Sequence, residues 1–366
     1  MVQRRRQRYK AIVHGPPQTF FTLLSFFLLT SPRTFSHLSF LKLSSTMGHQ
    51  MSSNLGHDAL PEYDASGNLI SPFYGYMPTQ WVCYVFAVLF VLATGLHFGQ
   101  AIRYRAWWLL PTVVPAGIGE TIGWGGRLWS TFQPLAENPY MIQIVCTIIA
   151  PTPLIGAIFI TFGRLSGHLG EQYSRLSARL YSRIFLTADI IALVVQSAGG
   201  GIAATTHDRK TGRLGSNIML AGIVFQLISL SVFCILVAEY LVRYFKERPA
   251  RPLLLTNNSS DSLREEFPRP PLDPSAKLLL IGLFFQSLVL YIRSIYRTIE
   301  LSDGFHGRII ETEVYFNVLD GAMVVLAMYS LIFFHPARLL KKMDKKFASG
   351  SNVPMIHKDV SFQDSV

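Results

Sequence analysis

The chain has 366 residues, of which 50% are hydrophobic and only 15% are charged. This composition is typical of membrane proteins and argues against a soluble domain pair of the same length. The formal charge of +11 does not indicate nucleic-acid binding, because Lys and Arg lie mainly in short segments between apolar runs, where they fix orientation and meet anionic headgroups.

The first 46 residues differ from the rest of the chain. A basic start precedes a short apolar run from Phe20 to Leu29, which is too short to span a bilayer and resembles the core of a signal sequence. The alternative is that Met47 is the true start and that residues 1–46 are a gene-model extension; the sequence leaves both open. Residues 47–78 are expected to form an extracellular N-terminal segment.

Seven later stretches are long and apolar enough to be transmembrane helices, which need roughly 20 mostly apolar residues. They are Trp81–Gln100, Ala106–Gly126, Tyr140–Phe162, Ile184–Ala204, Ile218–Tyr240, Leu278–Arg297 and Val314–Phe334. We therefore expect an all-α, polytopic membrane protein with seven transmembrane helices in a membrane domain of residues 79–337. Pro111, Pro115, Pro151 and Pro153 fall inside the second and third stretches, where the sequence predicts kinks.

Charge in the connecting segments predicts the orientation, because Lys and Arg near the ends of spans remain cytoplasmic. The segments after the first, third and fifth stretches and the C-terminal tail are rich in these residues, whereas the alternate segments carry few. The N-side of the first span is thus expected outside and the C-terminus in the cytoplasm. Residues 247–274 are then a flexible cytoplasmic linker, and residues 338–366 a basic, disordered cytoplasmic tail.

Ionisable and amide side chains recur inside the apolar stretches at helical spacing. The candidate site residues are Glu120, Asp189, Gln196, Arg293, Arg297, Glu300, Glu313 and Asp320. Spacings of three, four and seven residues keep each set on one helix face, so we expect an internal polar seam in which an arginine of the sixth span pairs with an acid of another helix. Which pairs form stays open, and a purely structural role in helix packing is the alternative for each residue.

Depth in the apolar stretches ranks these candidates. Glu120, Asp189, Arg293 and Asp320 lie deepest and are the main candidates for function, whereas Arg127, Glu300 and Glu313 are expected near the membrane surface. Gln196 is the kind of residue that holds helices together by hydrogen bonds.

Signatures of catalysis, nucleotide binding and metal binding are missing from the sequence. There is no phosphate-binding loop, no nucleophile elbow and no zinc-protease histidine pair, and His97 alone lies well inside a span. Cys83, Cys146 and Cys234 lie in apolar stretches without ligand-like spacing. We therefore expect no enzyme, no metal and no cofactor.

Several local motifs together resemble a fungal family of seven-span proteins. They include Tyr74-Gly-Tyr-Met-Pro78, Glu120-Thr-Ile-Gly-Trp-Gly-Gly-Arg127, Gln196-Ser-Ala-Gly-Gly-Gly201 and Arg293-Ser-Ile-Tyr-Arg297. The family is the resistance-to-aminocholesterol group, also called the lipid-translocating exporter family, which includes a sphingoid long-chain base transporter. The resemblance covers approximately Tyr74 to Pro336.

The resemblance implies a multi-pass protein of the fungal plasma membrane, or of a related endomembrane, that moves lipids or toxic amphiphiles and contributes to tolerance of them. Its partners would be membrane lipids or amphiphilic small molecules, with anionic headgroups at the cytoplasmic face. Under this hypothesis Asp189→Asn or Asp320→Asn should abolish export of a long-chain base. The alternative hypothesis is a seven-span receptor or stress sensor that signals through its cytoplasmic loops and tail.

Overall fold

The computed structural model describes residues 62–63, 67, 69–206, 208–250, 272–303 and 309–349. Within these ranges the regular secondary structure is helical apart from a small antiparallel hairpin of β1 (Glu62–Tyr63) and β2 (Leu69–Ile70). The possible leader, most of the N-terminal segment, most of the linker 247–274 and residues 350–366 lie outside the described residues.

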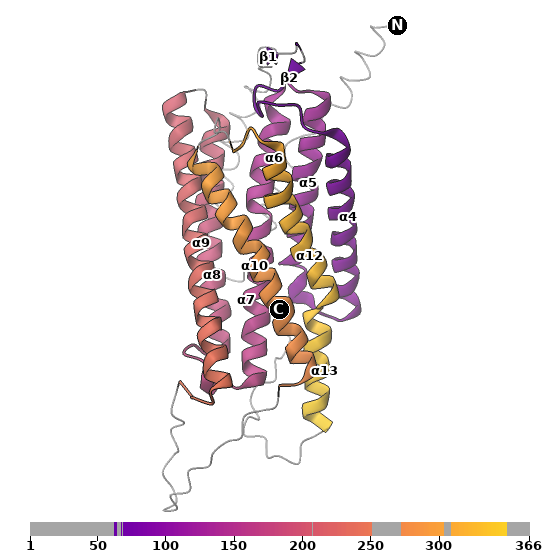
Figure 1. Cartoon of the computed structure of the whole chain (residues 1–366), viewed down its shortest axis with the longest axis vertical. Helices are drawn as coiled ribbons and strands as arrows, with labels where there is room; N and C mark the ends of the chain where they lie inside the picture. Colours follow the sequence, from indigo (N-terminus) through magenta and orange to yellow (C-terminus); the bar gives the residue numbers. More distant parts are fainter. Residues whose placement is uncertain are drawn as a thin grey trace, which may run out of the picture. The chain divides into compact units, whose positions relative to one another are not determined.

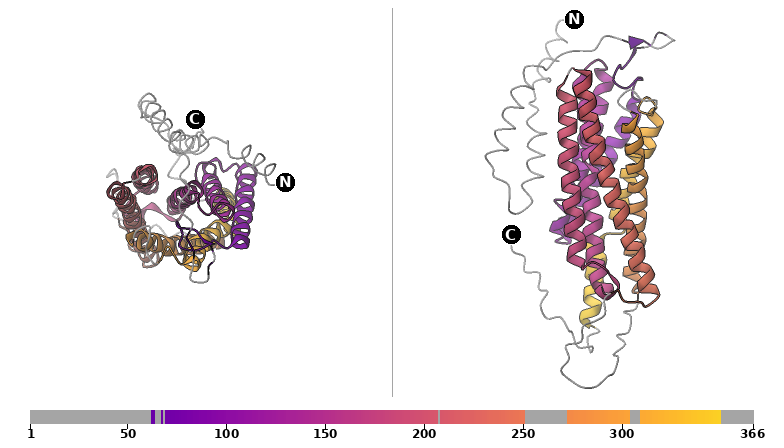
Figure 2. Two further views of the ribbon diagram at one scale, coloured as in Figure 1. Left: turned by 90° about the horizontal axis from the view of Figure 1, so that it is seen from above. Right: turned by 90° about the vertical axis from the view of Figure 1, so that its left-hand side faces the viewer.

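The helices form one bundle, in which the hairpin lies at one end and the last helix at the other (Figure 1). They are α4 (Gln80–Arg103), α5 (Val113–Phe132), α6 (Glu137–Ile149), α7 (Pro151–Leu169), α8 (Ala178–Thr205), α9 (Arg209–Phe245), α10 (Pro274–Ser302), α11 (Glu313–Tyr315), the π-helix η3 (Phe316–Ala322), α12 (Met323–Phe333) and α13 (Pro336–Ser349). Two short 3-10 turns, η1 (Trp107–Leu109) and η2 (Glu171–Tyr173), connect neighbouring helices. The long helices α8 and α9 lie side by side (Figure 2).

Six of the seven expected spans coincide with helices that are long and apolar enough to cross a membrane. These helices are Gln80–Arg103, Glu137–Leu169, Ala178–Ala203, Lys210–Phe245, Pro274–Ser302 and Glu313–Lys345. Large apolar side chains such as Val88, Ile235 and Phe284 are exposed on their outer faces. Outward-facing apolar residues on all-helical elements are what a lipid environment requires, so the chain is a multi-pass membrane protein.

The second expected span is the exception, and its predicted bounds are wrong. The segment from Ala106 first forms the 3-10 turn η1, and α5 begins only at Val113 and continues to Phe132. Pro111 lies before the helix and Pro115 in its first turn, where a missing N–H costs little, so neither kinks the helix interior. Glu120, Arg127 and five glycines make α5 less apolar than the six helices above.

The third expected span is divided where its prolines predicted a change of direction. Pro151 is the first residue of α7, directly after α6, and the two helices together make the span Glu137–Leu169. At the end of the chain, the expectation of disorder from residue 338 is wrong for residues 338–349, which belong to α13. Leu339, Leu340 and Met343 are buried because their helical spacing lets them pack on the bundle.

Candidate functional site

Arg127 of α5 lies at the hairpin end of the bundle and joins α5 to the segment before α4 and to α11. Its Nη2 donates to the hydroxyl of Tyr76 at 2.8 Å and to Oε1 of Glu313 at 3.2 Å. Glu313 in turn accepts hydrogen bonds from the backbone N–H and the hydroxyl of Thr79, at 2.8 and 2.6 Å, at the start of α4. One ion pair therefore connects α4, α5 and α11.

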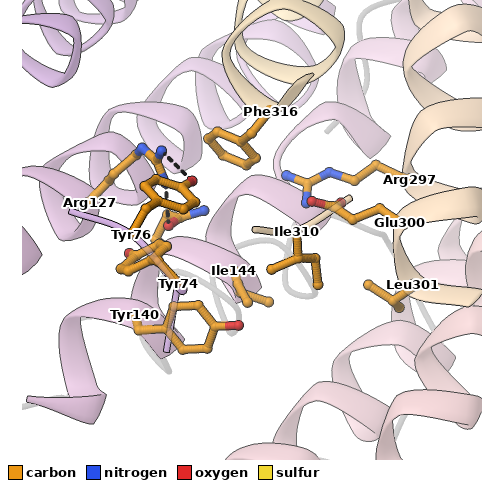
Figure 3. Close-up of a pocket in the computed structure, with 11 residues that line it drawn as sticks. Tyr74, Tyr76, Arg127, Tyr140, Ile144, Arg297, Glu300, Leu301, Ile310 and Phe316 are labelled. Carbon is orange, nitrogen blue, oxygen red and sulfur yellow. Dashed lines mark hydrogen bonds and ion pairs between the residues drawn. The ribbon is translucent and has the colours of Figure 1, made fainter. Parts of the chain in front are cut away.

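Aromatic rings surround the Arg127 guanidinium, which is 1% exposed. Its Cζ lies 4.6 Å from the ring centre of Phe316 and 5.2 Å from that of Tyr74. Phe316 also lies 5.2 Å from Cζ of Arg297, so that one ring separates two cations (Figure 3). Burial raises the pKa of Tyr74 and of Tyr76, and both therefore remain neutral hydroxyls near pH 7.

A second charged group forms deeper in the bundle, around Asp320 in the π-helix η3. Arg297 of α10 binds its carboxylate through two contacts, Nε to Oδ1 at 2.8 Å and Nη2 to Oδ2 at 2.6 Å. Arg293 lies one helical turn before Arg297 on α10. Its Nε is 2.8 Å from Oδ1 of Asp320 and forms a second ion pair. Asp320 thus sits between two guanidinium groups, and both of its oxygens are occupied.

The remaining donors of the two arginines reach α10 itself and α6. Arg297 also donates to Glu300 at 2.7 Å and to the Thr147 hydroxyl at 2.8 Å, and Arg293 donates to the Thr147 carbonyl. Thr147 can reach them because α6 packs closely on α5: a Cβ atom at Gly123 would lie 2.7 Å from the Thr147 methyl group. The position of Thr147 in the charged group therefore depends on a glycine of another helix.

Glu120 of α5 adjoins this group without being bound by it. Its side chain is fully buried, and neither carboxylate oxygen has a hydrogen-bond partner among the described residues. The charges that act on it are those of Asp320, Arg293 and Arg297. A buried carboxyl without a partner is costly in its ionised form.

A small cavity lies between the Arg127 and Arg297 groups. Its volume is about 20 Å³, which is roughly the space of one water molecule. It is lined by Tyr74, Tyr76, Arg127, Tyr140, Gln143, Ile144, Arg297, Glu300, Leu301, Ile310 and Phe316 (Figure 3). Nε of Arg127 and the hydroxyl of Tyr140 are buried at this lining and have no partner in the described part of the chain.

The structure brings six of the eight predicted site residues into one charged network. These are Glu120, Arg293, Arg297, Glu300, Glu313 and Asp320. Of the pairs that the sequence left open, those of Arg293 and Arg297 with Asp320 form. The pairs of Arg297 with Glu300 and of Arg127 with Glu313 were not predicted. We call these six residues together with Arg127 the charged network. Whether it acts in transport stays a prediction.

Asp189 and Gln196 of α8 lie outside the charged network. Gln196 donates to Gln226 of α9 at 3.0 Å, and Gln226 donates to the Thr152 hydroxyl of α7 at 3.2 Å, a chain of hydrogen bonds that holds three helices together. Asp189 is 2% exposed, and neither oxygen has a partner within the described ranges. The single polar seam of the sequence analysis is therefore divided into two regions.

Sequence reasoning underrated Arg127 and did not find Thr147. Arg127 was expected near the surface, although its spacing of seven residues from Glu120 places both on one face of α5. Thr147 gives no sequence signal, because threonine is common in apolar helices. In the described residues no cluster of three or more His, Cys, Asp or Glu side chains could hold a metal ion.

Comparison with known proteins relates the chain to a fungal membrane family. The family model described as "RTA1 like protein" matches residues 113–343, which is more than half of the chain. No solved structure matches it.

Three relatives from Saccharomyces cerevisiae illustrate the similarity. The sphingoid long-chain base transporter RSB1 is 28% identical over 311 residues, which cover 81% of each chain. Protoporphyrin uptake protein 1 is 27% identical over 290 residues, covering 70% of this chain and 89% of its own. Protein RTM1 is 30% identical over 211 residues, covering 57% and 62%.

Proposed function

The chain belongs to the RTA1-like family, and from this premise we propose that it is a membrane transporter that translocates lipids or amphiphiles of the sphingoid long-chain base type. The observation that carries the proposal is the charged network, in which ionisable side chains from α5, α10 and η3 meet inside an apolar bundle. Ionisable groups at membrane depth are costly, and they commonly mark substrate or ion pathways.

The dimensions of the cavity suggest how an amphiphile would be handled. A space of about 20 Å³ cannot enclose a lipid, so only a small polar headgroup would enter the charged network after local opening. The hydrocarbon chain would stay outside the bundle, against apolar side chains such as Ile281 and Phe284 on the exposed face of α10. We further propose that this transport contributes to tolerance of toxic amphiphiles and that the protein lies in the plasma membrane.

We propose different roles for the deep residues inside and outside the charged network. Asp320, with Arg293 and Arg297, is proposed to form the headgroup region, because these side chains adjoin the cavity wall at Arg297 and Glu300. Asp189 remains a separate candidate on α8. Its proposed part in transport predicts that Asp189→Asn stops export without reducing the amount of protein at the surface.

We also propose that α5 is the seventh membrane crossing. Its 20 residues extend about 30 Å at 1.5 Å per residue, the thickness of the hydrocarbon core. The hairpin before α4 and the helix α13 lie at opposite ends of the bundle (Figure 1), which requires an odd number of crossings. Six apolar helices and α5 satisfy that requirement. The charge pattern then supports an outside N-side and a cytoplasmic C-terminus.

A receptor or stress sensor remains the second candidate, and one contact favours it. The C-terminal helix α13 packs on α10, the helix that carries Arg293 and Arg297. A ligand that moved α10 at the charged network could therefore move α13 at the opposite end. The relatives named above as a transporter and an uptake protein favour transport over signalling and over catalysis.

The deciding experiment is reconstitution of the purified chain into liposomes without a partner or a nucleotide. We expect transfer of a fluorescent sphingoid base between leaflets in proteoliposomes and not in protein-free liposomes. Transfer at the protein-free rate, by protein shown to be folded, would reject the transporter and leave the sensor. Deleting residues after Lys346 should spare transfer if the chain is a transporter.

A further inference from the structure

The starting observation is that Glu120 has no counterion of its own. Its carboxyl group is fully buried, lacks any hydrogen-bond partner in the described residues, and lies beside ion pairs that are already complete. Arg297 directs its three nitrogens at Asp320, Glu300 and Thr147, and Arg293 pairs with Asp320 and donates to the Thr147 carbonyl. No described group donates a hydrogen bond to Glu120.

Without Glu120, the charged network is electrically neutral. The cations are Arg127, Arg293 and Arg297, and the carboxylates other than Glu120 are Glu300, Glu313 and Asp320, so the charges cancel at three against three. An ionised Glu120 would leave one uncompensated negative charge in an apolar bundle, at high cost in free energy. The network therefore requires one additional cation at Glu120.

Resting on the transport function proposed above, we propose that Glu120 is an exchange site for one cation, occupied by a proton in the empty protein and by a primary ammonium headgroup in the loaded one. On loading, the O–H bond of the Glu120 carboxylic acid breaks and the proton passes to water. The carboxylate that remains accepts N–H donors from the ammonium group. No electrons are transferred, and the charge of the network is the same in both states.

The other acids in the bundle fit this role less well. Both oxygens of Asp320 are bound by guanidinium groups. Asp189 has no charged neighbour acting on it, so a cation there would lie apart from the cavity and from every ion pair. The groups that act on Glu120 or feel its charge are Cys146 from α6, Arg293 and Arg297 from α10, and Asp320 from η3.

The network also gives the exchange a direction. Its ion pairs run from the Glu120 side of α5 through Arg297 and Glu300 to the cavity, and from there to Arg127 and Glu313 at the hairpin end. An ammonium headgroup that leaves Glu120, and the proton that replaces it there, would pass through this polar end of the bundle, which the proposed topology places outside.

Labelling with dicyclohexylcarbodiimide, which modifies protonated carboxyl groups in apolar surroundings, tests the empty state in the wild-type chain. We expect mass spectrometry to find the adduct on Glu120, and octadecylamine to reduce it severalfold while octadecanol, the neutral analogue, does not. Asp189 serves as the internal control, because its unpartnered carboxyl should be labelled equally with and without the amine. An unlabelled Glu120, or labelling that octadecylamine leaves unchanged, would overturn the proposal.

Proton release provides a second readout that does not depend on transport. In weakly buffered nanodiscs, octadecylamine should release protons from the wild-type chain and from Cys146→Ala, and Glu120→Gln should abolish this release while retaining the fold. Release that survives Glu120→Gln would place the exchange on another group and reject the inference. Because both experiments measure binding, they can succeed even if leaflet transfer in liposomes fails, and the two proposals are thus tested separately.

Discussion

Arg297 and Asp320 form a bidentate ion pair that connects α10 to the π-helix η3, with nitrogen–oxygen distances of 2.8 and 2.6 Å. Both side chains are at most 3% exposed, so neither charge is solvated by water. Paired in this way, a carboxylate and a guanidinium fix both the distance and the rotation of the two helices. The π-helix that carries Asp320 is itself a feature that occurs frequently at functional sites.

Removing the Asp320 charge should destabilise the bundle. Asp320→Asn leaves Arg293 and Arg297 buried with a neutral partner, and breaking a buried ion pair of this kind costs about 3–5 kcal/mol. Thermal unfolding in detergent, followed by size-exclusion chromatography, measures the effect. Asp189→Asn is the matched control, because that carboxyl pairs with no cation in the described residues and should lower the midpoint much less. Equal losses in the two variants would contradict the importance of the pair.

Close packing of α5 against α6 should be sensitive to one methyl group. A Cβ atom at Gly123 would lie 2.7 Å from the Thr147 methyl group, so Gly123→Ala forces the helices apart and should cost about 1–3 kcal/mol. Gly125→Ala on the same helix meets no atom within 4 Å and should be neutral or stabilising, since alanine favours helix. Denaturation of both variants measures the difference, and a tolerated Gly123→Ala would show that this contact is loose.

Site-directed labelling tests whether α5 crosses the membrane. With seven crossings, cysteines placed at Tyr63 and Asp208 lie on the same, outer side, whereas six crossings put them on opposite sides. Both positions are exposed. In a background with the three native cysteines replaced by alanine, a membrane-impermeant maleimide should label Tyr63→Cys and Asp208→Cys in intact cells.

The same labelling has its own control on the opposite side. Arg175→Cys, in the exposed connection between α7 and α8, should react only after the cells are permeabilised. Labelling of Tyr63→Cys without Asp208→Cys would favour six crossings. Labelling of Arg175→Cys in intact cells without labelling of Tyr63→Cys and Asp208→Cys would reverse the proposed orientation.

Anionic lipid should stabilise the chain through α13. The exposed face of this helix carries Lys341, Lys342 and Lys345, and each lysine near an anionic surface contributes about 1 kcal/mol. We expect phosphatidylserine to raise the thermal midpoint of the wild-type chain more than phosphatidylcholine does. Replacing the three lysines by glutamine should remove most of that difference, and an unchanged difference would assign the lipid contact to another surface.

Local information was enough to predict the helices and the polar stripes. The length and apolarity of each stretch are properties of consecutive residues, and a bilayer leaves helix as the only conformation that satisfies their backbone groups. The shared helix face of Arg293 and Glu300, which are seven residues apart, likewise follows from 3.6 residues per turn. Even the division at Pro151 was indicated by the residue itself.

Tertiary structure alone decided which stripes meet. Periodicity places a residue on a helix face but fixes neither the neighbour of that helix nor its rotation. Asp189 and Glu120 each lie deep in an apolar stretch, and the sequence does not show that only Glu120 adjoins the arginines. Thr147 enters the charged network because a glycine on α5 admits α6. The start of α5 and the helical α13 also depended on packing. The residues by themselves determined a polar-lined membrane bundle, and the packing of its helices determined which carboxyl lacks a partner.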